Sequence, residues 1–593
     1  LGIAAGYRID KGDDSTFLGW YAGYNATGSQ NTFVGSEAGK GGTSSAPFSS
    51  GQYNTAVGYQ ALVAFTTGEQ NVAIGRQAGI AITSGDDNIV IGKSVATNLT
   101  TGTNNIAIGE DALDLENSGT YQIAIGYRAG YKNRLSDTSY NTFIGNSAGR
   151  ENTSGNKNTY IGNGAGYGVD GGAGENNTAV GKYAIFHILG SNTTAIGQDA
   201  GYYASGSSNT FLGSNAGRGG TTSAPFSSGQ HNTAVGHNAL YAFTTGQYNT
   251  VIGKQTGQAI TTANYNTFVG AWAGDAATAS GYNTVVGFQA FSDAVADSSH
   301  TVAIGYQAGK AITTGDGNIM IGASAGNTTT DVDKAVIIGQ NAGQANMTSA
   351  ADGTIAIGYE AGKSITSGAR QTFLGYQAGY STTTGQENVF IGYQAGYSNL
   401  DNHGNIYIGK QVAYNVADGS YNVAIGEEAM KSTGTAANNH PSYNVAVGNQ
   451  AGYNLTTGDN NVFLGSRAGY ASTTTQGNVA IGYEAGRYIV TSAGQTAVGY
   501  QAMRSMVDGH SNTAFGYQAL TSEVASDEST AIGYQALTNQ SGSTSTLGNT
   551  AVGHLAGRDT TTAYRNTYVG KSAALSVTTG QQNTALGWTA LQN

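Results

Sequence analysis

The chain has 593 residues, with 92 glycines, 3 prolines and no cysteine, and its formal net charge is −11. Without cysteine it forms neither disulfide bonds nor thiolate metal sites. Its 25 lysines and arginines are scattered, whereas nucleic acid demands clustered basic side chains, so we expect no nucleic-acid partner. No apolar stretch is long enough to span a bilayer, so we expect no membrane insertion within this sequence.

A phrase of 17 residues recurs along the whole chain. It reads NTAVGYQALVAFTTGEQ at 54–70 and NVAIGRQAGIAITSGDD at 71–87, and its strand glycine returns 33 times between Gly19 and Gly587. A short fixed period is typical of a solenoid, in which each repeat buries its apolar face by stacking on its neighbours. We predict one continuous repeat array over residues 1–593. Because the sequence begins and stops within a repeat, we expect a segment of a longer polypeptide, incomplete at both ends.

Each repeat opens with an apolar triplet that predicts a short β-strand. Counting from the asparagine as position 1, positions 2 and 4 are β-branched or leucine in nearly every copy, and position 5 is glycine. Side chains two apart share one face of a strand, and we expect positions 2 and 4 to fill the coil. Position 3 is also apolar, and a strand that is apolar on both faces is buried on both. We therefore expect position 3 to pack against other copies of the chain.

The other positions predict how the coils stack. We expect the alanine at position 8 to lie on a second short strand that faces positions 2 and 4. The Thr-Thr-Gly segment at positions 13 to 15 predicts a turn, in which glycine takes a positive φ. Asparagine at position 1 predicts a ladder of side-chain amides along the stack. The predicted structural ladder is represented by Asn54, Val57, Gly58, Ala61, Asn71, Ile74, Gly75 and Ala78.

Three segments exceed the regular repeat and are predicted to leave the solenoid as loops. They are residues 36–53, 214–231 and 427–443, and the first two are nearly copies of each other, which indicates a duplicated block of coils. Loops on a rigid scaffold often carry binding function. In the alternative interpretation, each loop phenylalanine folds back to cover its own loop. The candidate ligand contacts are Pro47, Phe48, Pro225, Phe226, His440 and Pro441.

Tyrosine recurs at positions 6 and 10, as in Tyr376 and Tyr380. Stacked coils would align these rings into ladders, which either bind sugar rings and protein surfaces or pack only on each other. Enzyme motifs are incomplete: Gly92-Lys93-Ser94 lacks the first glycine of a phosphate-binding loop, and the eight histidines form no HExxH. We expect no catalytic residue, no metal site and no cofactor. We therefore expect that the protein is not an enzyme.

The apolar triplet closed by glycine, as in Asn71-Val72-Ala73-Ile74-Gly75, resembles the head repeats of YadA-like trimeric autotransporter adhesins. It also resembles the AIGYQAL-TTG arrays in tail-fibre proteins of phages and marine bacteria. The resemblance covers nearly the whole chain, although the period of 17 is longer than in the adhesin heads. It implies a left-handed parallel β-roll wound three together.

We therefore expect an all-β fold, a trimeric parallel β-roll or β-solenoid of about 34 coils, about 160 Å long at one strand spacing per coil. The expected function is the head or shaft of an extracellular attachment fibre on a cell or virion surface. Its partners would be copies of itself, as a homotrimer, and a host-cell glycan or protein receptor. The alternative is a self-assembling extracellular filament or sheath that grows into a higher polymer. A third class, an ice-binding solenoid, is disfavoured because position 2 alternates freely among Thr, Val and Ile.

Overall fold

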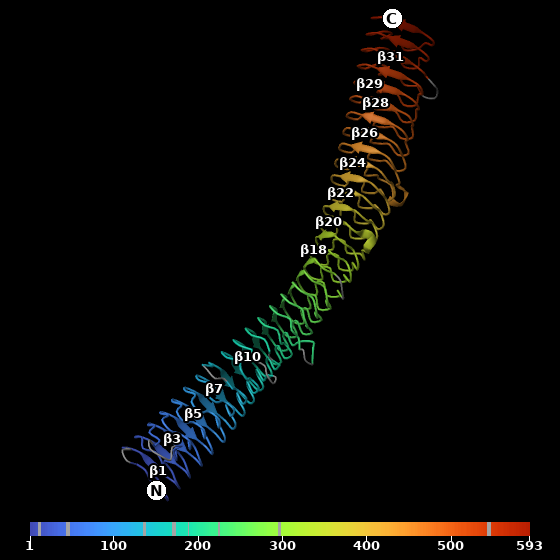
Figure 1. Ribbon diagram of the computed structural model, residues 1–593. Helices are drawn as coiled ribbons and strands as arrows, with labels where there is room; N and C mark the ends of the chain where they lie inside the picture. Colours follow the sequence, from blue (N-terminus) through green and yellow to red (C-terminus); the bar gives the residue numbers. More distant parts are fainter. Residues whose placement is uncertain are drawn as a thin grey trace. The chain divides into compact units, whose positions relative to one another are not determined.

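The structure of the protein is a computed structural model that describes residues 1–9, 13–42, 48–134, 138–168, 174–187, 189–222, 226–294, 298–542 and 547–592. The chain divides into two compact units, Leu1–Asp297 and Ser298–Asn593. Each unit is a parallel β-solenoid with a 17-residue period, in which consecutive strands lie side by side (Figure 1). The predicted all-β solenoid is confirmed.

The strands of the first unit are β1 (Thr16–Leu18), β2 (Thr32–Val34), β3 (Thr55–Val57), β4 (Val72–Ile74), β5 (Ile89–Ile91), β6 (Ile106–Ile108), β7 (Ile123–Ile125), β8 (Thr142–Ile144), β9 (Thr159–Ile161), β10 (Thr178–Val180), β11 (Thr194–Ile196), β12 (Thr210–Leu212), β13 (Thr233–Val235), β14 (Thr250–Ile252), β15 (Thr267–Val269) and β16 (Thr284–Val286).

The strands of the second unit are β17 (Val302–Ile304), β18 (Ile319–Ile321), β19 (Val336–Ile338), β20 (Ile355–Ile357), β21 (Thr372–Leu374), β22 (Val389–Ile391), β23 (Ile406–Ile408), β24 (Val423–Ile425), β25 (Val445–Val447), β26 (Val462–Leu464), β27 (Val479–Ile481), β28 (Thr496–Val498), β29 (Thr513–Phe515), β30 (Thr530–Ile532), β31 (Thr550–Val552), β32 (Thr567–Val569) and β33 (Thr584–Leu586). Two short 3-10 helices, η1 (Ser349–Ala351) and η2 (Ala436–Asn438), lie between strands of this unit.

Within each unit, equivalent positions of successive coils lie directly above one another. The pairing of β3 with β4 places Ala56 beside Ala73 and Val57 beside Ile74, in parallel register. The segment after the strand also forms hydrogen bonds from coil to coil, since the backbone amide of Gln77 donates to the Tyr59 carbonyl over 2.8 Å. Every position of the repeat therefore forms a column that runs along the stack.

Position 3, not positions 2 and 4, points into the coil. Ala56 and Ala73 are fully buried, whereas Val57 is half-buried and Ile74 is 38% exposed. The predicted orientation of the strand was therefore wrong. The physical reason is space: two apolar faces look alike in the sequence, but the narrow coil interior accepts the small residue and leaves the branched pair outside.

The interior is filled by complementary sizes at positions 3 and 9. Phe390 at position 3 faces Gly396 at position 9, where an added Cβ would lie 2.6 Å from the phenyl ring. The reverse combination occurs in another coil, where Ala514 is paired with Leu520, and both are fully buried. Where both positions are small, as at Ala356 and Gly362, Ile365, and Phe373 of the next coil, fill the space instead, so the interior stays densely packed.

The alanines at position 8 are buried as predicted, but they lie in a turn. Ala61 is fully buried between Gln60 and Leu62, which both adopt left-handed φ values, 54° and 53°. The predicted second strand is absent from this part of the described chain, and position 8 shares the interior with position 3. Alternation between left-handed and right-handed residues curls the backbone too tightly for a strand.

The glycines close the coils by permitting close backbone approach. At position 5, Gly58 has a φ of 134°, and a Cβ there would overlap the Gly75 carbonyl. At position 15, a Cβ on Gly68 would lie 2.6 Å from the Gly85 carbonyl oxygen, and its φ is not in the left-handed region. The predicted positive φ is therefore wrong for Gly68 and Gly85, where the constraint is proximity of the next coil, whereas Gly580 at the same position has a φ of 133°.

The asparagine ladder is confirmed. The Asn71 side-chain amide donates to Asn54 Oδ1 over 3.1 Å and to the Gly85 carbonyl over 2.8 Å. Its own oxygen accepts from the backbone and side-chain amides of Asn88, at 3.1 and 3.0 Å. Asn71 is fully buried, so the column satisfies backbone groups at a corner that water does not reach.

Candidate binding surfaces

The first predicted loop folds back onto the solenoid where it is described. Phe48 is half-buried, and the Arg8 guanidinium lies 4.5 Å from its ring centre. Pro47 lies outside the described residues. The contact with Arg8 places this phenylalanine against an earlier coil.

The duplicated loop makes a different aromatic contact. Phe226 stacks on His187, with ring centres 4.4 Å apart, and His187 stacks in turn on Tyr203. Burial lowers the pKa of the His187 imidazole. Phe226 is half-buried by this stack, so packing accounts for much of its surface, and Pro225 lies outside the described residues.

In the third loop, Pro441 is part of the hydrogen-bonded solenoid and His440 faces solvent. Pro441 is buried, and its carbonyl accepts a hydrogen bond of 2.7 Å from the Asn422 side chain. In regular coils the position-15 glycine accepts this bond, as Gly85 does from Asn71. His440 is exposed, and it is the member of this pair that a ligand can reach.

Tyrosine ladders form at the predicted positions. At position 6, Tyr500 and Tyr517 stack with ring centres 5.0 Å apart, and at position 10, Tyr380 and Tyr397 stack at 4.9 Å. Since the faces of neighbouring rings cover each other, each ladder presents ring edges and hydroxyl groups to solvent. Flat stacking of a sugar on these rings is therefore restricted to the ends of a ladder.

A third aromatic ladder, at position 17, was not predicted. Tyr248, Tyr265 and Tyr282 stack at 5.1 Å, and His231 extends the column at 4.8 Å. A shallow hollow beside it is lined by Thr245, Gln247, Tyr248, Thr262, Asn264 and Tyr265. The signal was in the sequence, where tyrosine or histidine directly precedes the position-1 asparagine.

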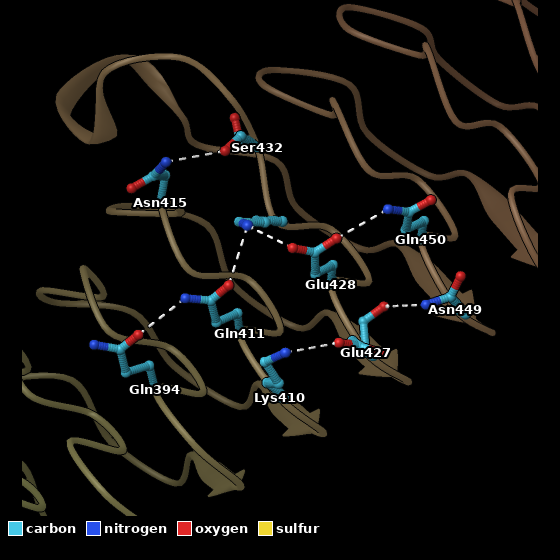
Figure 2. A network of polar contacts seen from close by, with 10 residues as sticks. Gln394, Lys410, Gln411, Asn415, Glu427, Glu428, Ser432, Asn449 and Gln450 are labelled. Carbon is cyan, nitrogen blue, oxygen red and sulfur yellow. Dashed lines mark hydrogen bonds and ion pairs between the residues drawn. The ribbon is translucent and has the colours of Figure 1, made fainter.

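Position 7 carries a long polar ladder in the second unit. Gln377 donates to Glu360 over 2.8 Å, Gln394 donates to Gln377 over 2.9 Å, and Gln411 donates to Gln394 over 3.0 Å. Figure 2 shows a later stretch, in which Gln394, Gln411, Glu428 and Gln450 lie on successive coils. The column continues through Arg467, Glu484, Gln501, Gln518 and Gln535.

Glutamates in this ladder pair with a cation three residues later. Lys363 lies 2.7 Å from Glu360, and Lys431 lies 2.6 Å from Glu428. The hydrogen bond from Lys431, with a second from Gln450, lowers the pKa of the Glu428 carboxyl. Each of these pairs is electrically balanced.

Glu484 departs from this balance, because three arginines surround it. Arg487 lies 2.6 Å away, Arg504 2.8 Å, and Arg467 3.9 Å. Burial raises the pKa of the Glu484 carboxyl, but hydrogen bonds from Arg504 and Gln501 outweigh burial, and the pKa lies below its usual value. The cluster retains positive charge in a chain that is acidic overall.

The outer face of the strands carries an apolar column at position 4 beside a mixed column of Thr, Val and Ile at position 2. Within each unit, positions 2 and 4 present columns of Thr, Val, Ile and Leu, and Leu374 and Leu464 are 44% and 43% exposed. Soluble monomers rarely expose apolar patches larger than a few hundred Å². This face is therefore a candidate for contact with another protein surface.

Over the described ranges, no three His, Asp or Glu side chains gather as a metal site. Across the same ranges, no helix is long and apolar enough to cross a membrane.

Comparison with known protein families, with curated proteins and with solved structures found no match. What the molecule itself defines is a parallel β-solenoid protein with an apolar strand face and polar or aromatic corners.

Proposed function

We propose that the protein forms the head or shaft of an extracellular attachment fibre, on a cell or virion surface, and that its working form is a homotrimer. The exposed apolar strand face carries this proposal. Three copies that turned this face toward a common axis would cover the columns at positions 2 and 4. The sequence resemblance to trimeric adhesin heads gives the same stoichiometry.

The corners of the coil support the attachment role. Positions 6, 10 and 17 carry tyrosine columns outside the strand triplet, as at Tyr248 and Tyr265, and His440 is exposed in an inserted loop. In an assembly that buries the strand face, these groups stay on the outside. They are then available to a host-cell glycan or protein receptor, and the fibre acts without catalysis.

The cysteine-free sequence allows a direct test of the assembly. We expect Ile74→Cys, on the outer strand face, to form intermolecular disulfides on mild oxidation, because three copies bring this position together at the axis. Tyr59→Cys, on the corner that follows strand β3, is the matched control and should remain reduced. Equal oxidation of both variants would contradict the proposed interface.

A second experiment separates attachment from the alternative function. The labelled assembly should bind host cells saturably, and a variant with Ile74, Ile91 and Ile108 replaced by lysine should bind less, since it loses the assembly. In the alternative, a self-assembling extracellular filament or sheath, the identical face on every coil permits association in many registers. Particle mass would then grow with concentration, and cell binding would not saturate.

A further inference from the structure

We propose that the arginine cluster formed by Arg467, Arg487 and Arg504 binds an acidic sugar, one that carries a carboxylate or a sulfate group. This inference rests on the proposed attachment function and assigns it a chemical class of receptor. It starts from an imbalance of charge. Between residues 444 and 507 the sequence holds only Asp459 and Glu484 as acidic residues.

The carboxylate at the centre of the cluster balances the charge of only one of the three arginines. Arg487 occupies the place that Lys363 has beside Glu360, three residues after the glutamate, and lies 2.6 Å from Glu484. Arg467 and Arg504 come from the coils on either side. Arg504 donates through Nε to Glu484 over 2.8 Å, and Arg467 donates through Nε to Gln450 over 3.0 Å. The three guanidinium charges nevertheless exceed the single carboxylate charge, and a guanidinium fork suits planar carboxylate and sulfate groups.

The excess cations are accessible, whereas the carboxylate is not. The side chains of Arg467 and Arg504 are 41% and 32% exposed, and that of Glu484 is 5% exposed. Arg504 belongs to position 10 and Arg467 to position 7, so both lie on the turn that follows the strand. An assembly that covers the strand face leaves this turn free.

Tyrosine surrounds the arginines and suits a sugar. The Arg487 guanidinium lies 5.0 Å from the centre of the Tyr488 ring and 5.5 Å from that of Tyr470, which fixes its orientation. Tyr483 and Tyr500 are 43% and 42% exposed on the same coils as Arg487 and Arg504. Ring edges and phenol hydroxyls offer both apolar contact and hydrogen bonds to a sugar.

The charge of the whole chain favours a short ligand over a long polyanion. With a net charge of −11, the protein repels an extended nucleic acid outside this local cluster. A single acidic sugar unit places its negative charge between Arg467 and Arg504 without meeting the acidic residues elsewhere. The geometry therefore points to a glycan and not to DNA or RNA.

The test uses glycan conjugates on a biosensor surface at low ionic strength. The probes are sialyllactose, which supplies a carboxylate, sulfated lactose, neutral lactose, and an oligothymidine of similar charge. We expect binding to one or both acidic lactoses and none to neutral lactose. Binding to sialyllactose alone or to sulfated lactose alone identifies which group supplies the charge, and either result supports the site.

The matched variants are Arg467→Gln with Arg504→Gln, and Lys363→Gln as control. Glutamine occurs at both positions in other coils, as Gln501 and Gln258, and Glu484 keeps Arg487 in the double variant. We expect the double variant to lose affinity for the acidic sugar by about tenfold, with unchanged solution mass, whereas Lys363→Gln retains it.

Four results would each overturn the acidic-sugar site. The wild-type protein could bind neutral lactose equally well, bind oligothymidine more tightly, or bind neither acidic lactose. The double variant could also retain full binding to the acidic sugar. The proposed function fails separately. If the wild-type assembly binds cells but neither acidic lactose, attachment stands and the site is wrong. If it binds neither cells nor sugars, both are wrong.

Discussion

Gly109 and Gly126, at position 5 of adjacent coils, approach so closely that a Cβ on Gly109 would lie 2.6 Å from the Gly126 carbonyl oxygen. The same close approach recurs in column along the stack, and the Gly109 amide donates to the Ile91 carbonyl over 2.8 Å. The spacing between coils therefore requires glycine at position 5. Any side chain there must separate two coils or break their pairing.

We predict that Gly109→Ala destabilises the local stack by about 3 kcal/mol. Gly477→Ala is the matched control, because Gly477 also has a positive φ, 67°, but nothing lies within 4 Å of an added Cβ. The control should cost only about 1 kcal/mol, the penalty for alanine in this conformation. Hydrogen exchange of the flanking coils measures both, and equal effects would show that close approach is not the constraint.

The asparagine ladder predicts a penalty that depends on side-chain length. Asn71→Ala leaves the Gly85 carbonyl and the Asn88 amide without their partner, and should cost about 2 kcal/mol. Asn71→Gln should cost less, because Gln371 at the same position of another coil still donates to the Gly385 carbonyl. Hydrogen exchange of the Asn88 amide reports the loss, with the exposed Asn163→Ala as control. Equal protection in all three variants would contradict a structural role for the ladder.

The ion pair of Glu428 with Lys431 predicts a pH dependence. The folded-state pKa of Glu428 is lowered from 4.5, so the contribution of this pair is fully present above that value. It is lost as the pH falls through the folded-state pKa, and it amounts to less than about 1 kcal/mol for so accessible a pair. NMR titration of the Glu428 carboxyl in the protein and in Lys431→Met measures the shift. An unchanged pKa in the variant would exclude Lys431 as its main cause.

We predict that replacing Tyr407 by phenylalanine does not lower the free energy of unfolding. Its hydroxyl is buried, and although the Asn422 side chain faces it, no hydrogen bond of normal geometry forms within the described chain. Burial raises the pKa of this phenol. Tyr407→Phe should be neutral or stabilising by up to about 1 kcal/mol, since Phe390 fills the same position one coil earlier. The exposed Tyr500→Phe is the control for thermal unfolding, and a clear loss in Tyr407→Phe alone would reveal a functional hydrogen bond.

Periodicity made the solenoid, its strands and its asparagine column predictable, but it did not orient the strand. A triplet such as Val72-Ala73-Ile74 is apolar on both faces, and alternation alone assigns neither face to the interior. The missing signal is the inverse relation between positions 3 and 9. Phe390 occurs with Gly396 and Ala514 with Leu520, which means that positions 3 and 9 share one limited space.

The candidate binding site required the fold as well. Arg467, Arg487 and Arg504 are far apart in the sequence and belong to two different positions of the repeat, so they look scattered. Stacking of three coils brings them around Glu484. The prolines of the inserted loops were predicted as ligand contacts, yet Pro441 is buried and its carbonyl accepts a hydrogen bond from the Asn422 side-chain amide.

Light scattering over a range of concentrations measures the solution mass and so distinguishes a trimer from a single chain. We predict a constant mass of three times the 60.3 kDa chain, because copies of the chain cover the columns at positions 2 and 4. A stable particle of single-chain mass would contradict it, since the strand face would then be compatible with water.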